Sequence, residues 1–164
     1  MASLTLPTIG HRDTEHYIGI AAKVAISDFG TAIPQHFDEL SAWATAHGVT
    51  PGLAFMKYNV IDMAGLLSIE FCFGTETAID GDGRVVAGVL PAGEYGTTTL
   101  TGTVDEVFDA TAVLVGWAKE RGIEWDASDT AEGHAFVSRI ERYHTDPDEN
   151  PEIVEIVEIA IKTR

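Results

Sequence analysis

The sequence predicts an α+β fold made of two tandem strand–helix–strand–strand units. These would form one antiparallel sheet with two long helices on one face and a ligand cleft on the other. Strand and helix patterns occur in the same order in both halves of the chain, and the two helical segments end in the same residue types at the same spacing. We expect one domain over residues 1–164, with units at about residues 14–80 and 84–162.

The first unit contains the patterns of a strand, a helix and two more strands. They cover residues 15–24, 33–44, 53–61 and 66–73. Pro34 is suited to a first helical turn, where its missing N–H costs nothing, and apolar residues then recur at helical spacing. Gly48 is expected to end the helix, because glycine readily adopts the left-handed conformation that follows a helix. Residues 62–65 supply a turn between the last two strands.

The second unit repeats this order after a turn at residues 80–83. Its segments are a strand interrupted by Pro91, a helix and two further strands, over residues 84–100, 103–121, 136–145 and 153–161. Thr103 and Glu106 form a capping-box pattern at the start of the helix, and Gly122 is expected to end it. A turn rich in Asp and Pro at residues 146–151 joins the final strands.

The helix ends supply direct evidence for duplication. Leucine, tryptophan, alanine and glycine recur at identical spacing in both units, and each glycine is followed by valine or isoleucine. The matching residues are Leu40, Trp43, Ala44, Gly48 and Val49 in the first unit, and Leu114, Trp117, Ala118, Gly122 and Ile123 in the second. Such internal repetition indicates two copies of one structural unit.

Composition and charge exclude several classes of function. The chain has 10 Lys and Arg against 26 Asp and Glu, and this formal net charge of −16 repels the phosphate backbone of nucleic acids. The two units also leave no segment for a helix-turn-helix element, so we expect no direct binding of nucleic acid. No apolar run is long enough to cross a membrane and the start lacks signal-peptide features, so we expect a cytoplasmic protein without membrane contact.

The sequence lacks motifs for metals, cofactors and covalent catalysis. No two of its six histidines form a pair at the helical spacing of a metal site, and residues 80–83 are followed by Arg84 instead of a calcium ligand. No glycine-rich nucleotide loop occurs. Cys72 is the only cysteine and lies in an apolar strand pattern, where a packed thiol is expected. We therefore predict neither a metal site nor a cofactor.

One carboxylate, Glu141, lies in the middle of a predicted strand. Alternation places Arg139, Glu141 and Tyr143 on one face of that strand, and Phe136 and Ile140 on the other. Because Phe136 and Ile140 are the more apolar set, we expect them to meet the helices, which leaves Glu141 and Tyr143 on the helix-free face. We interpret Glu141 as the floor of a ligand pocket. The alternative is a solvent-facing glutamate on an edge strand.

The equivalent strand of the first unit offers two alternative linings for such a pocket. Met56 and Tyr58 share one face of this strand, and Lys57 and Asn59 share the other. A thioether and a phenol ring suit a ligand surface, although both also pack in protein cores. The sequence leaves open which face lines the cleft.

A carboxylate at the base of an aromatic cleft has two uses. It can stay ionised and hold a cationic aromatic ligand, with the rings adding stacking and cation–π attraction. Alternatively, desolvation can raise its pKa until it acts as a general acid or base. The residues around Glu141 suit both uses.

Four stretches of the chain carry a family resemblance. Their characteristic residues are Ile33, Pro34, Phe37, Leu40, Trp43 and Ala44, then Leu90, Pro91, Ala92, Gly93 and Tyr95, then Leu114, Trp117 and Gly122, and finally Glu141, Tyr143, Thr145, Asp146, Pro147 and Pro151. In order and spacing these stretches resemble the GyrI-like small-molecule-binding domains, the effector-binding modules also attached to AraC-type and BmrR-type transcription regulators. The likeness covers about residues 14–162.

The resemblance implies the duplicated fold and a pocket between the two units, with Glu141 as its central acid. It also implies bulky, often cationic drugs as ligands, as in multidrug-binding members of the family. Some stand-alone members look like hydrolases of cyclopropane-bearing toxins, with this Glu as the acid or base. Many relatives have a tryptophan just before the Glu, whereas this chain has Ile140, which counts against a hydrolase.

We therefore predict a stand-alone protein that binds a small hydrophobic or cationic organic ligand. An enzyme is the less favoured alternative, and it would be a hydrolase using Glu141 as its catalytic acid or base. A third alternative is a protein-interaction inhibitor of a partner enzyme. The candidate ligand-binding residues are Glu141, Tyr143, Tyr58, Tyr95, Met56, Phe37, Phe71 and His36. The natural ligand and the oligomeric state do not follow from the sequence.

Overall fold

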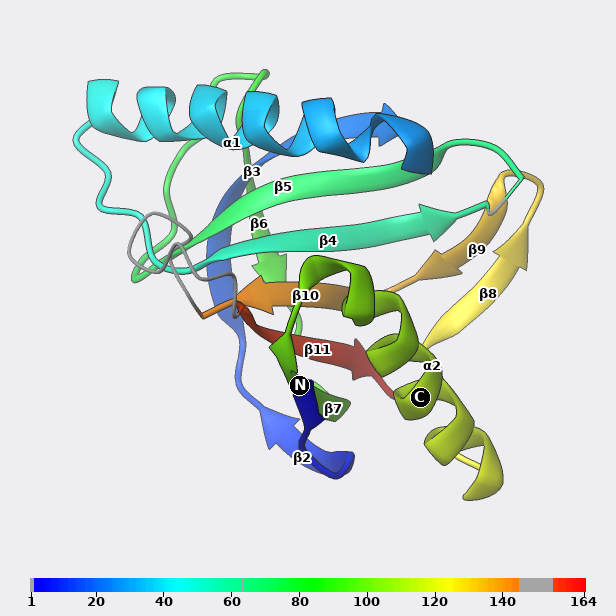
Figure 1. Ribbon diagram of the computed structural model, residues 1–164. Helices are drawn as coiled ribbons and strands as arrows, with labels where there is room; N and C mark the ends of the chain where they lie inside the picture. The colour runs from blue at the N-terminus through cyan, green and yellow to red at the C-terminus, as the bar shows by residue number, and fades with distance from the viewer. Residues whose placement is uncertain (1, 63, 145–154) are drawn as a thin grey trace.

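The computed structural model describes residues 2–62, 64–144 and 155–164 (Figure 1). The first repeat consists of β3 (Glu15–Val24), α1 (Phe29–Ala46), β4 (Ala54–Ile61) and β5 (Leu67–Thr75). The second repeat contains β7 (Gly93–Gly102), α2 (Val107–Glu120), β10 (Arg139–Tyr143) and β11 (Glu155–Lys162). This α+β architecture, with an antiparallel sheet and two long helices, confirms the predicted fold class.

The remaining elements extend the edges of the sheet or introduce the helices. The short helical turns η1 (Ile26–Asp28) and η2 (Val104–Glu106) precede α1 and α2. The added strands are β1 (Ser3–Leu4), β2 (Thr8–Arg12), β6 (Val86–Leu90), β8 (Ala127–Thr130) and β9 (Gly133–Phe136). The main path through the sheet runs β1-β7-β11-β10-β4-β5-β3-β6.

The two repeats meet at the centre of the sheet, where β10 pairs with β4 in antiparallel fashion. Glu141 lies opposite Met56 in this pairing. On either side the strands follow corresponding orders, β10-β11-β7 in one half and β4-β5-β3 in the other. The junction therefore places the central strand of each repeat side by side, as Figure 1 shows for β4 and β10.

Both helices pack on the same face of the sheet. Ala32 of α1 belongs to a buried cluster with Met56 and Phe71, while Leu114 of α2 is buried against Ile159 of β11. Strand pairing puts Phe71 opposite Met56, and puts Met56 and Ile159 on the two sides of Glu141. Directly opposed residues share a face, so the helix-covered face is the one that carries Glu141.

The opposite face encloses a second core because the sheet curls. β6 lies at one end of the sheet path and β7 near the other, yet only Pro91 and Ala92 separate the two strands. The two ends of the sheet must therefore approach each other. Residues from both ends and from the centre pack together inside the curl: Tyr17, Phe55, Cys72, Leu90, Tyr95, Ile140 and Ala160. A packed core thus occupies the face on which the sequence predicted a ligand cleft.

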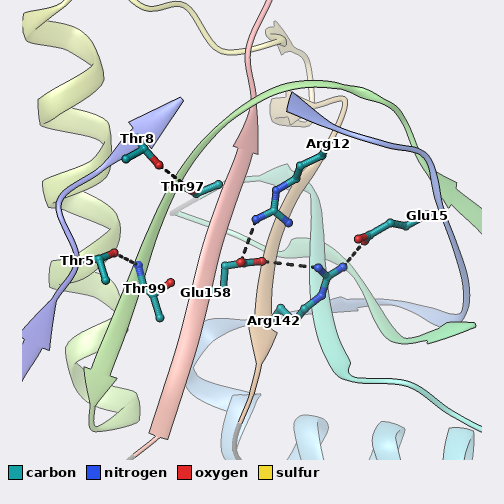
Figure 2. Close-up of polar contacts among 8 residues, drawn as sticks. All are labelled: Thr5, Thr8, Arg12, Glu15, Thr97, Thr99, Arg142 and Glu158. Carbon is teal, nitrogen blue, oxygen red and sulfur yellow. Dashed lines mark hydrogen bonds and ion pairs between the residues drawn. The ribbon is translucent and has the colours of Figure 1, made fainter. Parts of the chain in front are cut away.

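A network of ion pairs connects β2 to this helix-free side of the sheet (Figure 2). β2 pairs with β7, and Arg12 at its end lies 2.9 Å from Glu158 of β11. Arg142 of β10 lies 3.6 Å from the other oxygen of Glu158 and also contacts Glu15 of β3. The network therefore links β2, β3, β10 and β11 beside the second core.

The local signals at the helix ends are confirmed. Glu106 accepts the N–H of Thr103 at 2.8 Å in the predicted capping box. Gly48 and Gly122 have φ values of 67° and 66°, the left-handed conformation in which glycine avoids the steric cost of a Cβ. The start of α1 was predicted wrongly, because the helix begins at Phe29 and Pro34 lies inside it.

The segment before Glu141 also differs from the prediction of one long strand. β8 and β9 form a hairpin, and β9 ends at Phe136 before β10 begins at Arg139. β9 pairs with the end of β4 through Val60 and Ala135. The predicted turn at residues 146–151 lies outside the described residues. Neither of the long helices described has both the length and the hydropathy required to cross a membrane.

Candidate functional site

Glu141 lies at the centre of the sheet and not on an edge strand. Its strand, β10, pairs with β11 on one side and with β4 on the other, which excludes the edge-strand alternative. The side chain is only partly exposed. A carboxylate in such a position loses much of its hydration, so its hydrogen bonds decide whether the charge is tolerated.

Two tyrosines surround one oxygen of this carboxylate. The Tyr58 hydroxyl donates to Glu141 Oε2 at 2.9 Å, and the Tyr143 hydroxyl lies 3.3 Å from the same atom. The Tyr143 hydroxyl also lies 3.1 Å from Met56 Sδ. Among the described residues, both hydrogen bonds to this carboxylate go to Oε2 and none to Oε1.

These residues lie on the helix-covered face, and the prediction of the helix-free face for Glu141 and Tyr143 is wrong. Tyr143 packs against both the α1 cluster and the α2 cluster. Ile140, which was expected to meet the helices, instead belongs to the second core. Both faces of β10 are thus partly apolar, and the more hydrophobic face is not the one under the helices.

The ionisation of Glu141 reflects a balance of burial and hydrogen bonding. Burial raises the pKa of its carboxyl, and the hydroxyl of Tyr58, the charge of Arg139 and the hydroxyl of Tyr143 only partly offset this effect. The net pKa lies above the ordinary value for a glutamate. The ionised form is therefore less favourable here than in water, and a neutral or cationic partner beside it would be favourable.

This shift predicts how Glu141 affects stability at different pH values. Because its pKa is higher in the folded protein than in the unfolded chain, its contribution to stability is fully present below the unfolded pKa and is lost as pH rises through the folded pKa. We expect Glu141→Gln to raise the melting temperature at pH 7 by on the order of 2–4 °C and to have little effect at pH 4. Calorimetric melting at both pH values checks this, and an equal change at both would contradict it.

The packing of β4 shows which face of this strand lies beside Glu141, a point that the sequence left open. Met56 and Tyr58 face Glu141, whereas Lys57 and Asn59 point to the other face and contact Glu70. The Met56–Tyr58 face therefore adjoins the candidate site.

The α1 side of the site contains the other predicted wall residues. Phe71 lies opposite Met56 and is fully buried. His36 stacks on the Phe71 ring with centroids 4.5 Å apart, and Phe37 meets the same ring edge-on at 5.6 Å. The nearer ring nitrogen of His36, Nδ1, lies 2.6 Å from the carbonyl of Ala32. These three rings therefore form a continuous aromatic wall beside Met56.

Tyr95 is the predicted site residue that the structure places elsewhere. It belongs to the second core on the opposite face, and its hydroxyl donates to the carbonyl of Pro91 at 2.7 Å. The Leu-Pro-Ala-Gly-x-Tyr stretch thus closes the curl of the sheet. No local pattern in the sequence predicts this, since it depends on β6 at one end of the sheet path and β7 near the other.

Arg139 lies beside the site but was not among the predicted ligand-binding residues. It shares the strand face of Glu141, and its guanidinium carbon lies 5.8 Å from the centre of the Tyr58 ring and 4.8 Å from that of Phe136. Burial lowers the pKa of Arg139, and Glu141 and Tyr58 partly offset this. A guanidinium keeps its charge at neutral pH even so, so the site holds one positive and one negative side chain.

Two cavities lie away from Glu141. One of about 200 Å³ lies beside the β8–β9 hairpin, and another of about 410 Å³ lies beside the C-terminal end of α2. Around Glu141, the tyrosine hydroxyls occupy the positions beside Oε2. In the described parts of the chain, no three His, Cys, Asp or Glu side chains are grouped in a way that would hold a metal ion.

Comparison with known families identifies the domain. A family model for the GyrI-like small molecule binding domain matches residues 7–164. The chain belongs to the GyrI-like family. The family resemblance predicted from the four sequence stretches is therefore confirmed, and the chain carries a small-molecule-binding domain. Among curated protein sequences, none matches the chain.

Solved structures share this GyrI-like fold at low identity. The EcmrR C-terminal domain superposes with a TM-score of 0.73 at 17% identity, covering 97% of both chains. EcmrR in its complex with DNA gives a TM-score of 0.77 at 18% identity, and there the present chain spans only 57% of that protein. SAV2435 bound to tetraphenylphosphonium gives 0.61 at 12% identity, covering 98% of this chain and 94% of that one.

A further neighbour is described as a hydrolase. This protein from Listeria innocua superposes with a TM-score of 0.60 at 13% identity, covering 96% of this chain and 91% of the other. Likeness at such identities establishes the fold and leaves ligand and chemistry to the residues themselves.

Proposed function

We propose that this GyrI-like domain binds a bulky hydrophobic organic molecule, often cationic, over Glu141. The observation that carries the proposal is the desolvated carboxylate at the centre of the sheet, hydrogen-bonded by Tyr58 and Tyr143. A cation placed beside Glu141 would recover part of the electrostatic energy lost on burial. The rings of Tyr58, Tyr143 and Phe71 would supply apolar contact and, where they face the ligand, cation–π attraction.

The proposed ligand class agrees with one structural neighbour. SAV2435 is described as bound to tetraphenylphosphonium, which is a bulky lipophilic cation. In the present chain the formal net charge of −16 would raise the local concentration of such a ligand around the protein. Glu141 would then attract the cation at one defined site, which the overall negative charge of the protein does not do.

Titration with tetraphenylphosphonium tests the proposal. We expect Glu141→Gln to weaken binding about tenfold or more, because one lost charge interaction of about 1.4 kcal/mol changes affinity tenfold. Isothermal titration calorimetry at pH 7.5 measures the effect. The control is Glu120→Gln, since Glu120 is exposed at the end of α2 and its replacement changes the net charge equally.

The control separates a specific site from the general acidic field. Glu120→Gln should stay within about twofold of the unchanged protein, as expected for an exposed charge. Equal weakening in both variants would mean that the field alone attracts the dye. No binding in any variant would favour the protein-interaction alternative.

A hydrolase is the second candidate function, favoured by the raised pKa of Glu141. A carboxyl with a pKa closer to neutrality is better suited to proton transfer. Turnover of an electrophilic strained-ring substrate that is abolished in Glu141→Gln, while substrate affinity persists, would support it. Loss of affinity and turnover together would instead indicate that Glu141 acts in binding.

A further inference from the structure

The candidate site contains an arginine that forms no direct ion pair with a carboxylate of the described residues. In residues 2–62, 64–144 and 155–164, no carboxylate lies within 4.0 Å of Arg139, although Glu141 on the same strand face interacts with it at longer range. The two other partly buried arginines, Arg12 and Arg142, each contact Glu158. Arg139 is therefore the exception among the arginines of this sheet.

The contacts of Arg139 are with ring faces. Its guanidinium lies near the rings of Tyr58 and Phe136, which hold it in place by cation–π attraction but accept none of its N–H groups in conventional hydrogen bonds. Tyr58 also donates to Glu141 through its hydroxyl. One tyrosine thus touches both charged groups, so a ligand lying against Tyr58 meets a carboxylate at one end and a guanidinium at the other.

This arrangement suits a ligand with charges of both signs better than one that is purely cationic. A second positive group near Tyr58 would be repelled by Arg139, whereas a carboxylate would pair with its planar set of N–H donors. The donors remain unsatisfied by protein acceptors in the described residues, which makes them available to an anionic group. The Coulomb attraction of Glu141 for a cation remains in either case.

We propose that the natural ligand of this site is amphoteric, with a cationic or hydrogen-bond-donating group against Glu141 and a carboxylate-like group against Arg139. This inference rests on the proposed function and narrows its ligand class. Arg139 acts as the residue that determines specificity, and Glu141 remains the residue that anchors the cationic part.

Two dyes with the same ring system test this inference. Rhodamine 110 carries a free carboxylate beside its cationic xanthene, and rhodamine 123 is its methyl ester. We expect the unchanged protein to bind rhodamine 110 about tenfold more tightly, as a charge-assisted hydrogen bond allows. Arg139→Gln should remove this preference, whereas Arg139→Lys should keep part of it. Arg121→Gln is the control, because Arg121 is exposed and its loss changes net charge equally.

Fluorescence anisotropy with both dyes distinguishes the outcomes. If both dyes bind with equal affinity, or the ester binds better, and Arg139→Gln leaves that ratio unchanged, the inference is overturned while a Glu141-dependent site survives. If neither dye binds the unchanged protein, the inference is overturned, and the proposed function is overturned with it only if Glu141→Gln also leaves the binding of tetraphenylphosphonium unchanged. Should Arg139→Gln fail to fold, Arg139→Lys is compared with the control Arg121→Gln. If the ratio of affinities for the two dyes is the same in both variants, the inference is overturned.

Discussion

Replacing Lys57 by methionine is expected to lower the free energy of unfolding by about 3–5 kcal/mol, because it leaves a buried carboxylate without its counterion. Lys57 and Glu70 are 9% and 8% exposed, and Lys57 Nζ lies 3.3 Å from Glu70 Oε2. The same carboxylate also accepts from Asn59 at 2.7 Å and from the Tyr17 hydroxyl at 2.9 Å. These neutral donors cannot replace the positive charge.

Urea unfolding measures the effect, and a double variant identifies its cause. Lys57→Met with Glu70→Gln removes both charges, so most of the lost stability should return. Lys119→Met is the matched control, because Lys119 is exposed on α2 and its loss should cost less than about 0.5 kcal/mol. A cost below 1 kcal/mol for Lys57→Met alone would show that the pair is effectively solvated.

The second large effect is expected at the centre of α2. Leu114→Ala should lower the free energy of unfolding by about 3 kcal/mol, since deleting a buried leucine side chain loses its transfer energy and leaves a cavity. Leu114 is 0% exposed and packs with Val107 and Ala110 of its own helix against Ile159 and Ile161. Chemical denaturation followed by circular dichroism measures this loss.

The repeat supplies a matched comparison for Leu114. Leu40 occupies the corresponding position of α1 and is also 0% exposed, so Leu40→Ala should cost a similar amount. Val113→Ala is the control on α2, because Val113 is 49% exposed. If Leu114→Ala cost no more than Val113→Ala, α2 would not be anchored on the sheet through this residue.

The features that could be predicted from the sequence are those set by local chemistry. Thr103 and Glu106 satisfy each other's backbone groups within one turn, and Gly48 and Gly122 are needed where the chain turns left-handed. Both signals lie within a few residues of their effect. The same holds for β3, whose bounds match the predicted strand at residues 15–24.

The orientation of the site could not be predicted, because it depends on contacts between distant segments. Ile140 faces a core assembled from β3, β4, β5, β6, β7 and β11, which exists only because the sheet curls. Alternation identified which residues share a face with Glu141 but not which face the helices cover. The wrong prediction for Tyr95 has the same origin, since nothing near Tyr95 in the sequence indicates that β6 lies at one end of the sheet path and β7 near the other.

The β8–β9 hairpin was missed for a different reason. The residues of β8 are mostly polar and exposed, and those of β9 are only four in number, so the two strands lack the hydrophobic alternation by which strands are recognised. Gly133 has a φ of 136°, and a Cβ there would lie 2.6 Å from the carbonyl oxygen of Ile61. The hairpin is therefore defined by a close backbone approach to β4, which leaves little trace in the sequence around it.

The pairing of β4 with β10 also constrains the order in which parts of the protein can fold. The partners Met56 and Glu141 are far apart in the chain, and contacts of high sequence separation slow folding because the intervening loop must be closed first. Until β10 has been synthesised, β4 presents an unpaired edge that can pair with other chains. The candidate site is thus assembled late, only after β10 has been synthesised and has paired with β4.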